Sequence, residues 1–331
     1  MEDEKIISLL SQNYDLNINS IEKVKNTYKI YANEGKYCIK IIKYNYHHFN
    51  FILSAILHLQ NRGFNRIPEI LKTKNNTMYI NFFGNYAYLT KWVDSRVCNY
   101  NNVDELAKAS FKLGELHELS KGFIVTKDME PRIGWFSWID VFKTRKNEIL
   151  DFKKRIGQKA YKSEFDNLYL GALQEEIERA DRSINGLVNS KYFKLMEKEV
   201  FKLGFCHHDY ANHNVLIDID DNINIIDFDY CILDSHIHDL SEIMVHSMKN
   251  GKWSRDRGNI IIKNYLKTNY LLDEEMEVMG EFIRFPQMFW QLGIQMYWEQ
   301  QPWTEKKFLG RLNSYLEDRD KREKFVDTFF K

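Results

Sequence analysis

The chain has 331 residues, its 47 Lys and Arg are balanced by 47 Asp and Glu, and 44% of its residues are hydrophobic. This composition is ordinary for a globular protein, and the length suits one large domain or two moderate ones. A neutral balance excludes the basic surface of a nucleic-acid-binding protein, so we expect no nucleic-acid partner. No apolar run reaches the length of a membrane span, and the acidic start MEDEKIISLL is unlike a signal peptide, so we expect no membrane partner.

The four cysteines are scattered without the CxxC spacing of metal or redox motifs. Such a pattern is typical of reduced thiols in an intracellular protein. We therefore expect synthesis in the cytoplasm.

The first part of the chain predicts a small antiparallel sheet with one long helix. Alternating or clustered apolar residues, separated by turn residues, indicate the strands. The hairpin at residues 22–27 contains no glycine, and the helix expected over 47–62 contains no acidic residue. The elements predicted here are a short helix over 3–11, strands over 18–24, 27–32 and 36–43, the helix over 47–62, and strands over 69–73, 78–83 and 86–92, which complete the antiparallel sheet.

From residue 102 the chain is mostly helical. Apolar residues recur at helical spacing up to Gly122, and similar stripes follow. His117 on the first of these helices is expected to be structural. Trp135, Phe136 and Trp138 open the second, and core packing is favoured for them over lining a pocket. The later helices are predicted over 133–156, 161–189, 238–248, 255–270, 273–285, 288–299 and 307–317.

The stretch from Gly204 to Asp239 organises the rest of the chain. Two short apolar strands, 215–217 and 223–226, are joined by an acidic turn over 218–222. Because a hairpin returns on itself, Asn214 before the first strand and Asp227 after the second should lie side by side. Carboxylates and a carboxamide in one small volume suit a hard cation or a reacting hydroxyl.

The spacing within this stretch resembles the catalytic and metal-binding loops of kinases. His-x-Asp-x-x-x-x-Asn begins at His207 and is followed by Ile-Asp-Phe at Asp227. Protein kinases have Arg where this chain has His208, and Gly where it has Asp229. These departures point to small-molecule kinases, such as the aminoglycoside phosphotransferases and choline kinases. The wording HHDYANHNVLI, DFDYC and HDL is most similar to the CotS-type spore coat proteins, and the similarity spans nearly the whole chain.

This resemblance implies a two-lobed, protein-kinase-like α+β fold. The small antiparallel-sheet lobe would cover residues 1–93, and a large, mainly helical lobe would cover 94–331. ATP and Mg²⁺ are the expected cofactors. The roles implied are catalysis by Asp209 and Asn214, metal binding by Asn214, Asp227 and Asp229, phosphate binding by Lys40 in YCIKIIK, and adenine binding by the backbone of Lys91, Trp92 and Val93.

The implied function is ATP- and Mg²⁺-dependent phosphate transfer to a hydroxyl of a small molecule or glycan, with other spore coat proteins as further partners. The alternative is a structural coat component with little or no activity. The glycine-free hairpin and the acid-free helix favour this alternative. Because that helix carries no carboxylate, Lys40 is expected to approach Asp227 in the absence of nucleotide.

A zinc site is a third interpretation, because five histidines fall in the organising stretch. His236 and His238 would supply two ligands, but no further pair has a recognisable metal-binding spacing. His207 is expected instead to brace the catalytic loop. The histidines concerned are His207, His208, His213, His236 and His238.

Overall fold

A computed structural model describes residues 2–25 and 27–330. The chain forms two compact units, and both are discontinuous in sequence. The first contains Met1–Asn99, Glu115–Arg132 and Leu203–Leu233, and the second contains Tyr100–Gly114, Ile133–Lys202 and Asp234–Lys331. The hairpin of the organising stretch therefore belongs to the same unit as the N-terminal sheet. The lobe boundary between residues 93 and 94 stays a prediction.

The first unit contains the predicted antiparallel sheet, but with five strands in place of six, in the order β1-β2-β3-β5-β4. The segment 69–73 was wrongly predicted to be a strand, because it contributes only an isolated bridge from Ile70 to Thr90. Asn26, in the glycine-free hairpin, lies outside the described residues. The elements are α1 (Glu2–Asn13), β1 (Ile18–Val24), β2 (Thr27–Ala32), β3 (Gly35–Ile42), α2 (Tyr46–Asn61), β4 (Ile80–Phe82) and β5 (Asn85–Lys91).

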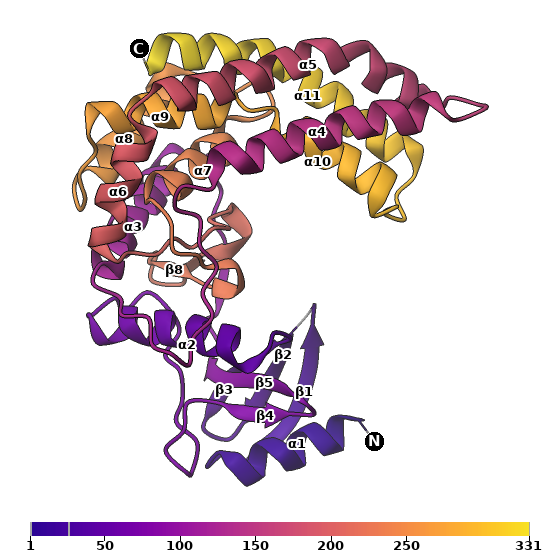
Figure 1. Cartoon of the computed structure of the whole chain (residues 1–331). Helices are drawn as coiled ribbons and strands as arrows, with labels where there is room; N and C mark the ends of the chain where they lie inside the picture. The colour runs from indigo at the N-terminus through magenta and orange to yellow at the C-terminus, as the bar shows by residue number, and fades with distance from the viewer. Residues whose placement is uncertain (1, 26, 331) are drawn as a thin grey trace. The chain divides into compact units, whose positions relative to one another are not determined.

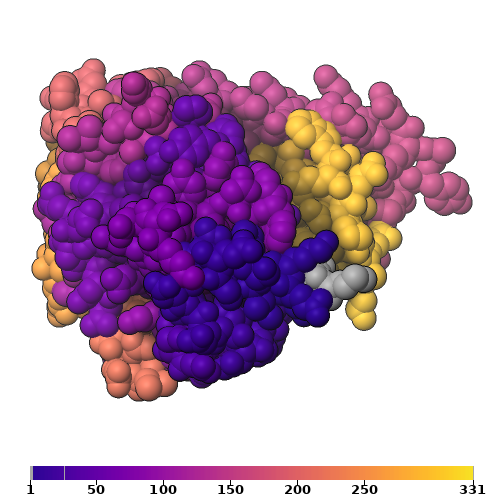
Figure 2. Space-filling model, turned by 90° about the horizontal axis from the view of Figure 1, so that it is seen from below, coloured from indigo at the N-terminus to yellow at the C-terminus, as the bar shows by residue number. Residues whose placement is uncertain are grey.

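The two faces of this sheet pack against different helices, because side chains alternate between the faces along each strand. Leu10 of α1 packs in one buried cluster with Ile39 of β3, so α1 covers that face (Figure 1). Lys40 of β3 points to the opposite face, where α2 lies and Phe49 stacks on Tyr86 with ring centroids 5.0 Å apart. α1 and the first strands of the sheet belong to the part of the chain that is coloured indigo in Figure 2.

The hairpin completes the first unit. β6 (Ser95–Val97), β7 (Val215–Asp218) and β8 (Ile223–Ile225) form a three-stranded antiparallel sheet. Oδ1 of Asp218 accepts the backbone N–H groups of Asp220 (3.0 Å) and Asn222 (2.9 Å), which closes the acidic turn. The 3₁₀ turns η1 (Asn212–Asn214) and η2 (Phe228–Tyr230) flank the hairpin. The predicted hairpin is therefore confirmed.

The second unit is helical, and α4, α5, α10 and α11 lie together in Figure 1. Tyr169 stacks on Phe289 with ring centroids 3.9 Å apart in a large aromatic core. Gly293 permits this packing, because a Cβ there would lie 2.3 Å from the ring of Phe152. The elements are α3 (Val103–Ser120), whose last turns belong to the first unit, α4 (Trp138–Gly157), α5 (Glu164–Asn189), α6 (Tyr192–Lys202), α7 (Ile237–Met248), α8 (Arg255–Tyr265), α9 (Asp273–Arg284), α10 (Gln287–Gly293), the π-helical turn η3 (Ile294–Trp298) and α11 (Glu305–Phe329).

Sequence reasoning missed α6 and half of α11. The buried stripe of α6 runs through Leu195 and Met196 to Glu199, so a charged residue interrupts its apolar pattern. In α11 charged residues such as Asp318 and Arg322 are also buried, which hides its periodicity. Trp138 is a core residue, as expected: it is buried, and its indole N–H donates to Oδ2 of Asp234 at 2.8 Å.

Among the residues that the structure describes, no helix combines the length and the apolar character needed to span a bilayer.

Glu199 gives the second unit a predictable response to acid. Its carboxylate lies 3.2 Å from Nδ1 of His236 and also pairs with Lys202. Burial alone would raise the pKa of Glu199, but these two partners lower it to about 2. A lowered folded-state pKa stabilises the protein above the unfolded value of about 4.5, and this contribution is lost as the pH falls towards 2.

We therefore expect the unsubstituted chain to lose about 3 kcal/mol of unfolding free energy between pH 5 and pH 2 that Glu199→Gln does not lose. Urea unfolding at a series of pH values measures the difference. Glu197→Gln, at an exposed position of the same helix, is the control and should retain the full loss. Parallel pH curves for Glu199→Gln and the unsubstituted chain would contradict this account.

Candidate active site

The ends of the hairpin bring Asn214 and Asp227 together, as the sequence predicts. Val215 pairs with Ile225 across β7 and β8, and the backbone N–H of Ile226 donates to the carbonyl of Asn214 at 3.0 Å. Asp227 is the next residue, and both side chains line the same pocket.

Asn214 also fixes the loop that carries Asp209. Its Nδ2 donates to the backbone carbonyl of Asp209 at 3.0 Å and to Oδ2 of Asp209 at 2.7 Å. Asn214 is 2% exposed, so these bonds are shielded from water. The amide oxygen is then the end of Asn214 that remains for a cation, and the Asp209 carboxylate is held in one orientation.

His207 braces the loop, as expected. The backbone N–H of Asp209 donates to Nδ1 of His207 at 3.3 Å, so Nδ1 is the acceptor and Nε2 carries the proton. Nε2 then donates to the carbonyl of Ile226 at 2.9 Å. Two left-handed residues shape the site: His208 has φ 62° and Asp227 has φ 68°. Such backbone angles cost non-glycine residues about 1 kcal/mol or more, and they often mark functional sites.

Lys40 lies between two carboxylates. Its Nζ is 2.7 Å from Oδ1 of Asp227 and 2.9 Å from Oδ2 of Asp229. The expected approach of Lys40 to Asp227 is thus confirmed, while the contact with Asp229 was not foreseen. Oδ1 of Asp229 is buried and receives no hydrogen bond from the described residues.

The protonation of these three groups reflects their mutual charges. Burial would lower the pKa of Lys40, but Asp229 and Asp227 raise it. Burial would likewise raise the pKa of Asp227, but Lys40 keeps it below its usual range. The pKa of Asp229 is raised, first by burial and then by the charge of Asp227. One ammonium therefore cannot fully neutralise two carboxylates, and the site favours a further cation.

Lys40, Asn214, Asp227 and Asp229 lie on the wall of a pocket of about 1040 Å³, and every lining residue belongs to the first unit. Asp209 and His207 are not among the lining residues. Val24 of β1 and Leu216 of β7 supply apolar walls, and the predicted adenine-binding segment Lys91–Val93 lies along it. The backbone N–H of Trp92 donates to the carbonyl of Lys36 at 2.9 Å, so it is not available to a base. The backbone groups of Lys91 and Val93 remain as candidates.

Several pocket residues escaped sequence reasoning. Cys38 faces Thr90, and Lys40 faces Tyr88, across the β3–β5 ladder, and all four line the pocket. Only the strand register reveals this, because a one-residue slip would turn these side chains to the other face. Ile56 of α2 also contributes to the wall.

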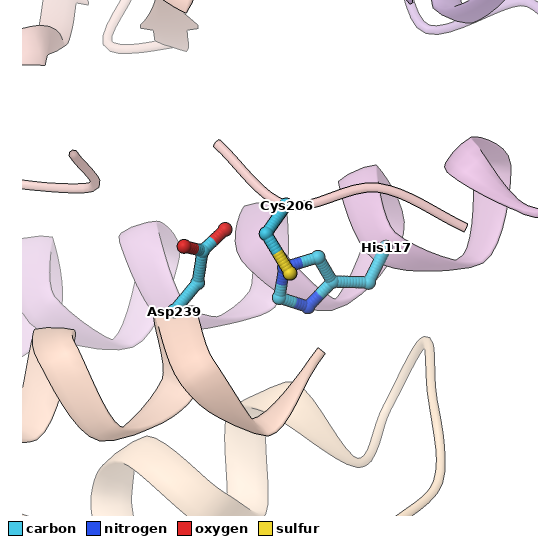
Figure 3. A group of neighbouring side chains, drawn as sticks. All are labelled: His117, Cys206 and Asp239. Carbon is cyan, nitrogen blue, oxygen red and sulfur yellow. The ribbon is translucent and has the colours of Figure 1, made fainter. Parts of the chain in front are cut away.

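The histidines do not assemble the zinc site considered above. In the second unit, His236 groups with Glu199 and Glu275, whereas His238 groups with Asp239 and Glu242. The two histidines therefore point into different clusters. In the first unit His117 lies beside Cys206 (Figure 3), and both are buried. Asp239, also drawn there, belongs to the second unit.

The Lys40 ion pairs predict how the nucleotide-free protein binds divalent cations. Replacing Lys40 by Met removes the charge that competes for Asp227, so Asp227 should bind Mn²⁺ roughly tenfold more tightly. Electron paramagnetic resonance of free Mn²⁺ measures the change. Lys43→Met, which removes an exposed lysine from the same pocket, is the control and should change the affinity less. Weaker Mn²⁺ binding in Lys40→Met would contradict the arrangement.

Comparison with solved structures identifies the fold as kinase-like. An aminoglycoside phosphotransferase from Alicyclobacillus acidocaldarius superposes with a TM-score of 0.85 at 20% identity, covering 98% of this chain and 94% of that one. The spectinomycin phosphotransferase APH(9)-Ia, solved with ADP and spectinomycin, gives 0.68 at 15% identity, covering 99% and 98%. A choline/ethanolamine kinase family protein from Mesorhizobium loti gives 0.53 at 14% identity, covering 98% of each chain. These similarities confirm the predicted two-lobed, kinase-like fold class.

One family accounts for almost the entire sequence. Residues 7–329 match the family described as "Spore coat putative kinase YutH". This range includes the N-terminal sheet, the hairpin with its polar residues and the helical second unit. The chain therefore belongs to the YutH family of spore coat kinase-like proteins, which confirms its resemblance to the CotS type.

Proposed function

We propose that this protein is an ATP- and Mg²⁺-dependent phosphotransferase of the spore coat that phosphorylates a hydroxyl of a small molecule or glycan. The observation that carries the proposal is the pocket whose wall unites Lys40, Asn214 and Asp227 with the apolar and backbone groups that suit a nucleotide base. Membership of a spore coat family supports the location, with synthesis in the cytoplasm and other coat proteins as further partners.

The nucleotide would lie in this pocket with its base near the backbone of Lys91 and Val93. Apolar contact from Val24 and Leu216 suits a flat ring. Proteins with a similar fold support a nucleotide, since the spectinomycin phosphotransferase was solved with ADP and spectinomycin, and the amicoumacin kinase hAmiN was solved with AMP-PNP and Ca²⁺.

ATP would supply the phosphoryl group, and Mg²⁺ would neutralise its charge. Asn214 and Asp227 would hold the Mg²⁺, with Asp229 beside them. Lys40 would bind the phosphates. Asp209, held by Asn214 and close to His213 (3.7 Å from Oδ2), would orient the acceptor hydroxyl and receive its proton. The donors fit these roles, because carboxylate and amide oxygens are preferred by Mg²⁺ and an ammonium suits phosphate.

The remaining alternative is a structural coat component that keeps the fold without turnover. It is favoured by the absence of acidic residues from α2. Calorimetry with ATP, with and without Mg²⁺, separates the two functions: the enzyme should bind ATP more tightly with Mg²⁺. A chain that neither binds nor hydrolyses ATP would be a scaffold.

Removing the charge of Asp227 tests the proposed metal site. Asp227→Asn keeps a side chain that tolerates the left-handed backbone but removes the charge, so Mg²⁺ should strengthen ATP binding about tenfold less than in the unsubstituted chain. Calorimetric titrations in Mg²⁺ and in EDTA measure this ratio. Asp220→Asn, on the exposed turn of the same hairpin, should leave the ratio unchanged. If Asp227→Asn also leaves it unchanged, Asp227 does not hold the metal.

Replacing the carboxylate of Asp209 tests its proposed role in catalysis. Asp209→Asn retains an oxygen that can accept the hydrogen bond from Asn214 but cannot take a proton. Turnover should fall by about 10²–10⁴, whereas ATP affinity should stay within about threefold. Steady-state ATP hydrolysis and calorimetry on the same preparations measure the two quantities. Equal turnover in the variant would remove Asp209 from the chemistry.

A further inference from the structure

The helix beside the pocket offers Lys40 no carboxylate. No acidic residue occurs in α2. The side chain that it contributes to the pocket wall is Ile56, which is 2% exposed. An ammonium that must bind phosphate in a fixed position needs a counter-charge from elsewhere.

Asp229 provides a carboxylate beside Lys40 that α2 does not provide. It is the central residue of η2, and η2 packs against α2. Its Oδ2 is 2.9 Å from Nζ of Lys40, and its side chain is 22% exposed, compared with 36% for Asp227. Asp229 is therefore the more enclosed of the two partners of Lys40.

We propose that Asp229 is a positioning residue that anchors Lys40 from the loop after β8, in place of a carboxylate on α2. The proposal rests on the phosphotransferase function proposed above and deepens it. An ammonium has three N–H donors. Asp227 accepts one of them at 2.7 Å, Asp229 forms an ion pair with the ammonium at 2.9 Å, and a further donor remains for a phosphate oxygen.

Two carboxylates then serve two cations. When Mg²⁺ takes Asp227, Asp229 still holds Lys40, so the metal and the ammonium need not compete for a single carboxylate. Without Asp229, Lys40 would pair with Asp227 alone, and the metal would have to displace Lys40 from that carboxylate. The negative charge left over in the cluster of one ammonium and two carboxylates would be balanced by the metal.

A double-mutant cycle distinguishes this anchor from a direct metal ligand. Mn²⁺ affinity in the presence of ATP is measured by electron paramagnetic resonance for the unsubstituted chain, Asp229→Asn, Lys40→Met and the double variant. We expect Asp229→Asn to weaken Mn²⁺ binding about tenfold when Lys40 is present and only about two- to threefold in the Lys40→Met background. An equal or larger loss in the Lys40→Met background would make Asp229 a metal ligand and overturn the proposal, as would no loss in either.

Moving the carboxylate from position 229 to α2 tests the same idea. Ile56 of α2 and Lys40 line the same pocket, so Ile56→Glu adds a carboxylate to this pocket from α2 and, combined with Asp229→Asn, should recover most of the lost Mn²⁺ affinity. Ile56→Gln with Asp229→Asn is the matched control, since it introduces a polar side chain of similar size without the charge. Recovery in both combinations, or in neither when both fold, would contradict an anchoring role.

A measurement on the nucleotide-free chain keeps this test independent of the proposed function. The ammonium protons of ¹⁵N-labelled Lys40 should stay protected from water exchange in Asp227→Asn and lose protection in Asp229→Asn. The reverse result would overturn the anchor. If the unsubstituted chain binds no ATP, the phosphotransferase proposal fails, whereas the exchange of Lys40 still decides which carboxylate holds it.

Discussion

The ion cluster of Lys40, Asp227 and Asp229 is the constraint on which the site depends. Lys40 and Asp227 are 187 residues apart in sequence, yet Nζ and Oδ1 are 2.7 Å apart. Each group is partly buried, so each charge is costly unless an opposite charge lies beside it. The cluster therefore ties the sheet that carries Lys40 to the hairpin that is followed by the two carboxylates, and both belong to the first unit.

The hairpin supplies the geometry that the cluster needs. Pairing of β7 with β8 brings Asn214 next to Asp227, and the left-handed backbone at Asp227 turns the chain at once into η2, where Asp229 reaches Lys40. His207 holds the approaching loop through Ile226. The backbone strain at Asp227 is thus stored where three functional side chains must meet.

Family membership and chemistry are separate conclusions here. The match over residues 7–329 and the kinase-like superpositions concern the whole fold. The chemistry depends on a few charges: α2 contains no acidic residue, and the loop after β8 carries Asp229, which lies 2.9 Å from Lys40. The interaction between opposite charges depends on their distance and not on the element that carries each charge.

The sequence by itself determined the small antiparallel sheet, the hairpin and the closeness of Asn214 to Asp227, because strand alternation and hairpin return are local rules. It also indicated that Lys40 would approach Asp227, since α2 had no carboxylate to offer. It did not predict α6, because a buried Glu199 interrupts the helical stripe. Only the tertiary structure decided that Asp229 contacts Lys40, that Tyr88 and Thr90 line the pocket, and that His236 and His238 point into separate clusters. These facts depend on strand register and on packing between distant segments, which no local pattern encodes.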